Sequence, residues 1–410
     1  MKKTTHFKFL FIGLFFSLMS CVDPYQLQTS NYEEAIVIEA TITNELKKHE
    51  VLISKTYRLE ENEPVLVSNA SVTVSDNLGN QYNFNEEDGK YISTTEFRAE
   101  NDRLYKLNIT TSDGKSYSST TQKLTTINEL QNITATVITN LEGQRGVEIA
   151  ANSFDPTNSS KYYRFEFYET SKATAPKWRP VYAVVNPDIL GYVGHEYIEL
   201  FPRTYEAQVC YLTEKNKKTI LTSTNLLNED RVSNFPVHFI NDFDYKIGER
   251  YSIEVKQLIQ NLESYTFYKT LQELAETGES ILSQNQPGFL VGNIKSDDNQ
   301  NEKVIGFFEV ASVSSKRIFF NYEDLFPGEQ KPPYLEDCTE LEYNYCFLPD
   351  EPICDGRQLN SNVRANSLTY YFHEQFEPPT PLNLIYTYVR AKCGDCTTFS
   401  SNIRPDFWID

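Results

Sequence analysis

The sequence predicts a mainly β protein: tandem immunoglobulin- or fibronectin-like β-sandwiches, one amphipathic helix, and a cysteine-rich, proline-rich C-terminal segment. Three observations favour this class. The chain has 27 Tyr and 26 Phe, which suit strands, but only two Met. Short alternating runs recur at spacings of ~8–12 residues, separated by turns rich in Asx and Gly. Helical periodicity is confined to one stretch, and five of the seven cysteines follow residue 326.

Residues 1–20 predict the signal peptide of a lipoprotein. Lys2 and Lys3 form a basic start, and the apolar run from Phe9 to Leu18 is too short to cross a ~30 Å hydrocarbon core comfortably. Cys21 follows Leu-Met-Ser, which resembles the lipobox of bacterial lipoproteins. We therefore expect cleavage before Cys21 and lipidation of its thiol. The alternative is an ordinary secretory signal with a chance cysteine.

The charge of the chain argues against a nucleic-acid partner. The formal net charge is −19, and loss of the three lysines of the leader makes the mature chain −22. Such an acidic chain repels phosphate backbones, and no run of Lys and Arg resembles a nucleic-acid footprint. An anionic leaflet would repel it too, so we expect attachment to the membrane through acyl chains.

A first β-sandwich is predicted over residues 33–126, after a polar, aperiodic tether at 21–32. The apolar residues Ile36, Ile38, Ala40 and Ile42 alternate with mostly more polar neighbours, the period of a half-buried strand. Further strand-like runs, with turn-rich segments between several of them, cover residues 50–56, 70–75, 81–84, 90–93, 103–109 and 116–121.

A second β domain is predicted over residues 127–325, with long loops at 171–180 and 187–194. Its strand-like runs cover residues 133–139, 146–151, 162–169, 235–240, 250–258, 289–294, 303–310 and 317–321. The loop at 295–302 contains Asp297 and Asp298, for which we expect a solvated hairpin tip. A calcium site is the alternative, but the spacing matches no known calcium loop.

The one predicted helix, at about 264–282, lies inside this second domain. Tyr265, Tyr268 and Leu271 recur at helical spacing, and Ser264 is a candidate N-cap. We expect the helix to pack against the second sandwich, with binding of a partner as the alternative.

The segment 326–410 is rich in proline and has little periodic apolar pattern, so we expect disulfides to supply its order. Six cysteines besides Cys21 are the candidates for disulfides: Cys210, Cys338, Cys346, Cys354, Cys393 and Cys396. Six cysteines allow fifteen pairings, and Cys393 and Cys396 could bridge each other or reach other loops. A zinc site at this C-x-x-C is the alternative, but a second C-x-x-C is missing and the expected compartment is oxidising.

The search for reaction chemistry predicts that the protein is not an enzyme. His49, His195, His238 and His373 remain after loss of the leader, and none lies within metal-ligand spacing of another. The sequence contains no zinc-protease, nucleophile-elbow or phosphate-loop motif. Two carboxylates could still meet in space as a glycosidase pair. We expect no cofactor and no metal.

Several segments, in order, resemble one family. They are Cys21-Val-Asp-Pro24, Val37–Glu45, Ala70–Val74, Tyr265–Leu274, Gly288–Ile294, Ala311–Arg317, Cys393-Gly-Asp-Cys396 and Arg404–Trp408. Together they are similar to Bacteroidota outer-membrane lipoproteins defined by a large domain of unknown function and often encoded beside a TonB-dependent receptor. The family usually has two glycines after the second cysteine of the C-x-x-C, where this chain has Thr398 to Ser401.

The resemblance implies a lipid-anchored outer-membrane protein, facing the cell exterior, that is a non-catalytic accessory or ligand-capturing partner of a TonB-dependent receptor. It implies no catalytic residue, and it makes Trp408 an anchor of the C-terminal end on the body. The alternatives are a structural or assembly accessory of an outer-membrane complex and, third, a surface hydrolase.

Overall fold

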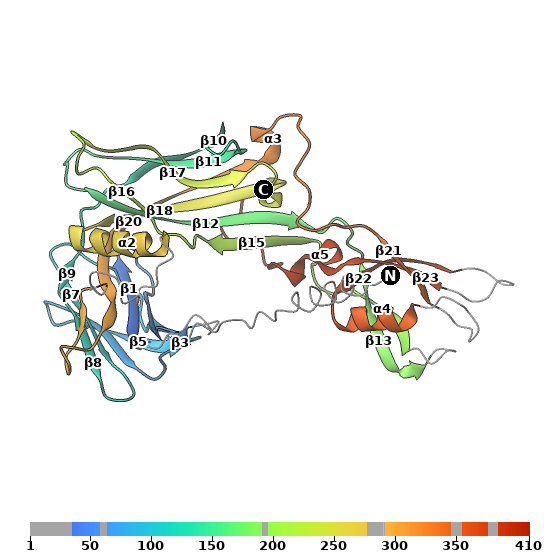
Figure 1. The fold of residues 1–410 in the computed structure, drawn as a ribbon, viewed down its shortest axis with the longest axis horizontal. Coiled ribbons are helices and arrows are strands. Elements are labelled where there is room, and N and C mark those ends of the chain that lie inside the picture. The colour runs from blue at the N-terminus through green and yellow to red at the C-terminus, as the bar shows by residue number, and fades with distance from the viewer. Residues whose placement is uncertain are drawn as a thin grey trace, which may run out of the picture.

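The computed structural model describes residues 35–57, 64–190, 196–276, 290, 292–345, 355–375 and 384–410. These residues form several sheets and a few short helices, so the mainly β class is confirmed (Figure 1). Among them, no helix is long and apolar enough to cross a membrane. The expected leader, Cys21 and the tether at 21–32 lie outside the described residues.

The first layer is a curled sheet. Its strands are β1 (Ile36–Thr43), β2 (Glu50–Lys55), β3 (Val65–Leu66), β4 (Ser71–Asp76), β5 (Gln81–Glu87), β6 (Lys90–Ser93), β7 (Leu104–Thr110), β8 (Ser116–Ser119), β9 (Gln122–Lys123) and β19 (Ile294–Ser296). The predicted alternation of β1 is confirmed, because its four apolar residues at even positions are buried. The sheet curls back on itself, since Asn293 exchanges two hydrogen bonds with the backbone of Phe308.

The second layer is a sandwich of two sheets. Its strands are β10 (Leu130–Thr139), β11 (Arg145–Asp155), β12 (Tyr162–Thr174), β15 (Val209–Lys215), β16 (Ile220–Ser223), β17 (Asp230–Asn241), β18 (Arg250–Gln260) and β20 (Val304–Asn321), with η1 (Tyr245–Ile247) and α3 (Tyr322–Leu325) beside them. The sheet β10-β11-β17 faces the sheet β15-β12-β18-β20, and side chains of both fill one core. The aromatic residues Phe165 and Tyr251 and the aliphatic residue Ile149 lie at its centre, all fully buried.

Strand β20 belongs to both layers. Its first half, from Val304 to Ala311, pairs in parallel with β1, and its second half, from Ser312 on, pairs antiparallel with β18. The boundary expected at residue 126 therefore places β19 and the first half of β20 in a different domain from the one in which they lie. The alternation of apolar and polar residues within a strand cannot predict that β1 pairs with β20, because these strands are far apart in sequence.

The expected break between strands 303–310 and 317–321 is wrong, because β20 runs through it. Polar residues fill the middle of the strand. The segment 125–130, which connects the first layer to the second, satisfies their hydrogen bonds. The Ser312 hydroxyl donates to the Thr126 carbonyl, and the Ser312 backbone amide donates to the Thr125 hydroxyl oxygen. The Ser314 hydroxyl oxygen accepts from the Leu130 amide.

The predicted helix is present as α2 (Leu262–Glu276), and residues 277–282 lie outside the described part. The side chain of Asn261, not that of Ser264, caps it by accepting from the backbone amide of Ser264. Its buried residue Phe267 packs with Ile305 and Phe307, where the two layers join.

The remaining strands and helices form a third unit with its own core, which the polar pattern of 326–410 did not predict. They are β13 (Val181–Leu190), β14 (Glu196–Pro202), β21 (Leu341–Tyr345), β22 (Leu368–Gln375), β23 (Leu384–Arg390), α4 (Gly356–Arg364), α5 (Ala391–Gly394) and η2 (Cys396–Thr398). Tyrosines supply much of the core, with Tyr345, Tyr386 and Tyr388 almost fully buried. The expected loop at 187–194 begins inside β13, whose hairpin with β14 packs here.

Two disulfides tie this unit together and to the body. Cys210 of β15 pairs with Cys396, and Cys338 pairs with Cys393. The two cysteines of the C-x-x-C therefore bridge to other loops and not to each other. Disulfide formation is confirmed for these four candidates, whereas Cys346 and Cys354 lie outside the described residues.

Removing the longer crosslink should destabilise the protein more than removing the shorter one. The pair Cys210→Ser with Cys396→Ser opens a loop of 186 residues, and Cys338→Ser with Cys393→Ser opens one of 55. We expect losses of about 2–5 kcal/mol in unfolding free energy, because each crosslink restricts the unfolded chain. Urea unfolding of the oxidised variants measures them. A larger loss for the 55-residue loop would contradict this account.

Candidate functional site

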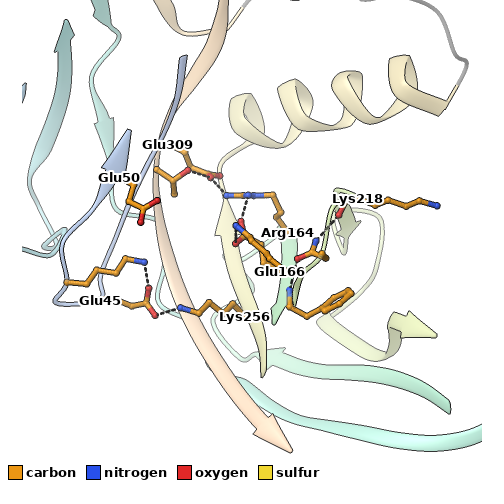
Figure 2. Close-up of polar contacts among 12 residues, drawn as sticks. Glu45, Glu50, Arg164, Glu166, Lys218, Lys256 and Glu309 are labelled. Atoms are coloured by element: carbon orange, nitrogen blue, oxygen red, sulfur yellow. Dashed lines mark hydrogen bonds and ion pairs between the residues drawn. The ribbon is translucent and has the colours of Figure 1, made fainter. Parts of the chain in front are cut away.

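A cleft of about 530 Å³ lies between the two layers. The turn between β1 and β2 forms one wall, and β12 with the turn between β15 and β16 forms the other, as Figure 2 shows around Glu45, Arg164 and Lys218. Strand β18 contributes Lys256 and Leu258 between the walls, and α2 contributes Tyr268. The cleft thus exists because β20 holds the two layers beside each other.

The lining of the cleft is basic, although the chain as a whole is acidic. Eight basic side chains line it: Lys47, Lys48, Lys90, Lys215, Lys217, Lys218, Lys256 and Arg164. The acidic residues of the lining are fewer: Glu39, Glu45, Glu50 and Glu166. Eight of the 38 Lys and Arg residues of the chain therefore converge on one cleft, in a protein whose net charge is −19.

A buried carboxylate organises the inner end of the cleft. Glu309 of β20 is 2% exposed and accepts hydrogen bonds from Gln260 at 2.7 Å and from Ser264 at 2.5 Å. Its other oxygen lies 2.5 Å from Arg164, whose second amino group binds Glu166 at 2.6 Å. Burial alone would lower the pKa of Arg164, but Glu309, Tyr268 and Glu166 together outweigh it and raise that pKa, so the guanidinium stays charged.

A second carboxylate joins one wall to strand β18. Glu45 lies 2.7 Å from Lys47 on its own wall and 3.0 Å from Lys256 of β18 (Figure 2). Burial alone would raise the pKa of Glu45, but the hydrogen bonds from these two lysines lower it below its ordinary value. Within the other wall, Lys215 lies 2.9 Å from Glu166. These ion pairs orient the cations that line the cleft.

Three lysines have no acidic partner among the described residues. Lys48 lies on the turn between β1 and β2, and Lys217 and Lys218 lie on the turn between β15 and β16. All three are exposed, and they belong to turns on opposite walls of the cleft. Their ammonium groups are the charges that the fold itself does not use.

The protonation of the cleft suits binding better than proton transfer. Burial alone would lower the pKa of Lys215 and of Lys256, but Glu166 and Glu45 respectively raise them, so both amines stay protonated. Burial alone would raise the pKa of Glu166, but Arg164 and Lys215 lower it. A general base or acid at neutral pH needs shifts in the opposite direction.

The histidines do not come together in the structure. His49 is buried beside Phe97, His238 lies 3.5 Å from Glu169, and His373 bonds to Tyr370, while His195 lies outside the described residues. Among the described residues, no group of three His, Cys, Asp or Glu could hold a metal ion.

Asp297 and Asp298 lie in the loop between β19 and β20. The expected hairpin is wrong, because β19 pairs with β8 and not with β20. Asp297 accepts from the Ser118 hydroxyl at 2.6 Å, and Asp298 accepts from the Ser116 amide at 2.7 Å. One oxygen of each carboxylate is therefore engaged by β8. At the other end of the chain, Trp408 is 4% exposed and packs edge-on against Tyr211, as expected of an anchor.

Sequence reasoning missed the basic cleft. The local signal was present in two short runs, Lys47-Lys48 and Lys215-Asn-Lys-Lys218. Each run is too short to stand out as a binding footprint. Only the fold places the two runs on opposite walls of one cleft.

A family model described as a domain of unknown function (DUF4249) matches residues 22–317. The chain belongs to this family. The matched range contains every residue that lines the cleft of this DUF4249 protein, but it ends before β21. A comparison with curated proteins finds no match.

Acid should destabilise this DUF4249 protein through His49. Burial lowers the pKa of His49 to about 4, from an ordinary value near 6.5. The unfolded chain therefore binds a proton that the folded chain excludes, and stability falls as pH drops from about 6.5 to about 4, by roughly 3 kcal/mol. His49→Gln keeps a donor for the Phe97 carbonyl but does not titrate. Urea unfolding from pH 7 to pH 4 should show a smaller decline for this variant, and an identical decline would contradict the assignment.

Loss of one partner of the Arg164–Glu309 ion pair should lower the unfolding free energy more than expected from the loss of both partners together. Arg164→Met leaves Glu309 buried without its cation, for which we expect a loss of about 3–5 kcal/mol in unfolding free energy. The double variant Arg164→Met with Glu309→Gln should lose less than the sum of the two single variants, because neither charge is left unpaired. Additive losses in urea unfolding would show that the two groups act independently.

Proposed function

We propose that this DUF4249 protein is a lipid-anchored outer-membrane protein, facing the cell exterior, that captures a ligand in the cleft between its two β layers. It acts without catalysis, as an accessory of a TonB-dependent receptor. The observation that carries the proposal is the cleft itself, about 530 Å³ in size and lined by charges held ready for binding. Ligand sites of small molecules have volumes of this order.

Other observations support parts of this proposal. The lipobox-like pattern before Cys21 supports anchoring by acyl chains. The two disulfides support an oxidising compartment, such as the bacterial envelope. The receptor enters through the resemblance to lipoproteins encoded beside such receptors.

A structural or assembly accessory is the second candidate, favoured by the hairpin of β13 and β14. Its inner face buries Val185 and Ile198 in the core of the third unit. Its outer face exposes apolar side chains around Glu199, with Val184, Tyr197 and Phe201 38%, 37% and 40% exposed. An apolar outer face suits contact with another protein.

Anchoring and partnership can be tested on the full chain in the bacterium that makes it. We expect the wild type to incorporate an alkyne-labelled fatty acid and to fractionate with the outer membrane, and Cys21→Ala to do neither. A tag at the C-terminus should bring down a TonB-dependent receptor, identified by mass spectrometry. A wild type without label, or a pull-down without any such receptor, would overturn the proposal.

The same pull-down separates the two candidates. Variants Lys217→Gln with Lys218→Gln alter the cleft, and Val184→Ser with Phe201→Ser alter the outer face of the hairpin. Capture of a ligand predicts that the lysine variants retain the receptor but weaken uptake of its substrate. A scaffold predicts that only the hairpin variants matter, because they alone remove the apolar contact.

A further inference from the structure

We infer that the cleft binds a small ligand that carries several anionic groups, such as sulfates, carboxylates or phosphates. This inference rests on the proposed function, because it names the class of ligand for the same site. It follows from three features of the cleft: a surplus of positive charge, the placement of that surplus, and the ion pairs that hold the other cations in place.

The surplus is the positive charge of the lining that remains after its acidic residues are subtracted. Eight basic side chains line the cleft, against four acidic residues of the lining and Glu309 behind Arg164. Three positive charges therefore remain without compensation. In a chain of net charge −19, lysines scattered among carboxylates would be more stable than lysines gathered together. The fold does not need the surplus, so binding of an anion is the use that fits it.

The placement of the surplus implies more than one anionic group on the ligand. Lys48 stands on one wall, and Lys217 and Lys218 stand on the other. The surplus charges therefore come from two separate turns, and a ligand that carries several anionic groups can contact both. A recess with one sign of charge also focuses the field and attracts a ligand of opposite charge from a distance.

The ion pairs inside the cleft fix the shape that the ligand meets. Glu45 ties Lys47 to Lys256, and Glu166 ties Lys215 to Arg164, so these cations are already oriented. Lys215 and Lys256 also lie 5.6 Å and 5.9 Å from the ring centre of Tyr168. A site held in place before binding loses less freedom when the ligand arrives.

Titration calorimetry tests this inference on the mature, lipidated chain in a non-ionic detergent. The probes are sucrose octasulfate, citrate and inorganic triphosphate, with sucrose as the uncharged counterpart of the first. We expect saturable binding of one molecule per chain for at least one of the three anions, no binding of sucrose, and weaker binding at higher salt. The tightest of the three identifies the anionic group.

The decisive comparison is between two pairs of lysine variants with the same net charge. Lys217→Gln with Lys218→Gln should weaken binding of the anion about tenfold, as expected when two charge contacts are lost. The control, Lys123→Gln with Lys331→Gln, removes two exposed lysines that do not line the cleft and should leave the affinity unchanged. None of these four side chains belongs to an ion pair among the described residues.

Two results would overturn the inference. One is the absence of binding by all three anions, and the other is an equal loss in both pairs of variants, which would show attraction by net charge alone. Either result leaves the pull-down of a receptor untouched. Conversely, saturable binding of an anion by a protein that brings down no receptor would keep this inference and reject the partnership.

Discussion

The whole architecture depends on the pairing of β20 with two strands that are far from each other in the chain. Eight residues of β20 pair in parallel with β1, and the rest pair antiparallel with β18. One strand of 18 residues thus belongs to the sheets of both layers. The backbone hydrogen bonds of a continuous strand resist bending. The layers therefore sit at a fixed relation, and the cleft beside this strand has a fixed shape.

The same junction carries the most buried charge of the cleft region. Glu309 points from β20 to residues of β12, β18 and α2, so one carboxylate links four elements. A buried ion pair is weak evidence for stability, because removal of both charges from water is costly. The Glu309 carboxylate does specify how these elements pack, since only their correct packing gives both of its oxygens hydrogen-bond partners.

The cations of the cleft are of two kinds: those in ion pairs with carboxylates of the fold, and exposed lysines without an acidic partner among the described residues. Ion pairs of the lining use most of the cations and raise the pKa values of Lys215 and Lys256. Three exposed lysines remain. This distribution of charge is the basis of the proposal that the cleft binds an anion.

The sequence by itself determined most strands of the two layers and the helix. Alternation from Ile36 to Ile42 is a local property of a half-buried strand, and the spacing around Tyr268 is a local property of a helix, so both could be predicted from neighbouring residues. Tertiary structure alone decided that Cys210 pairs with Cys396 and that Lys48 and Lys217 line one cleft. Those residues are separated by more than 160 positions, and their proximity depends on which strands pair, which no local pattern encodes.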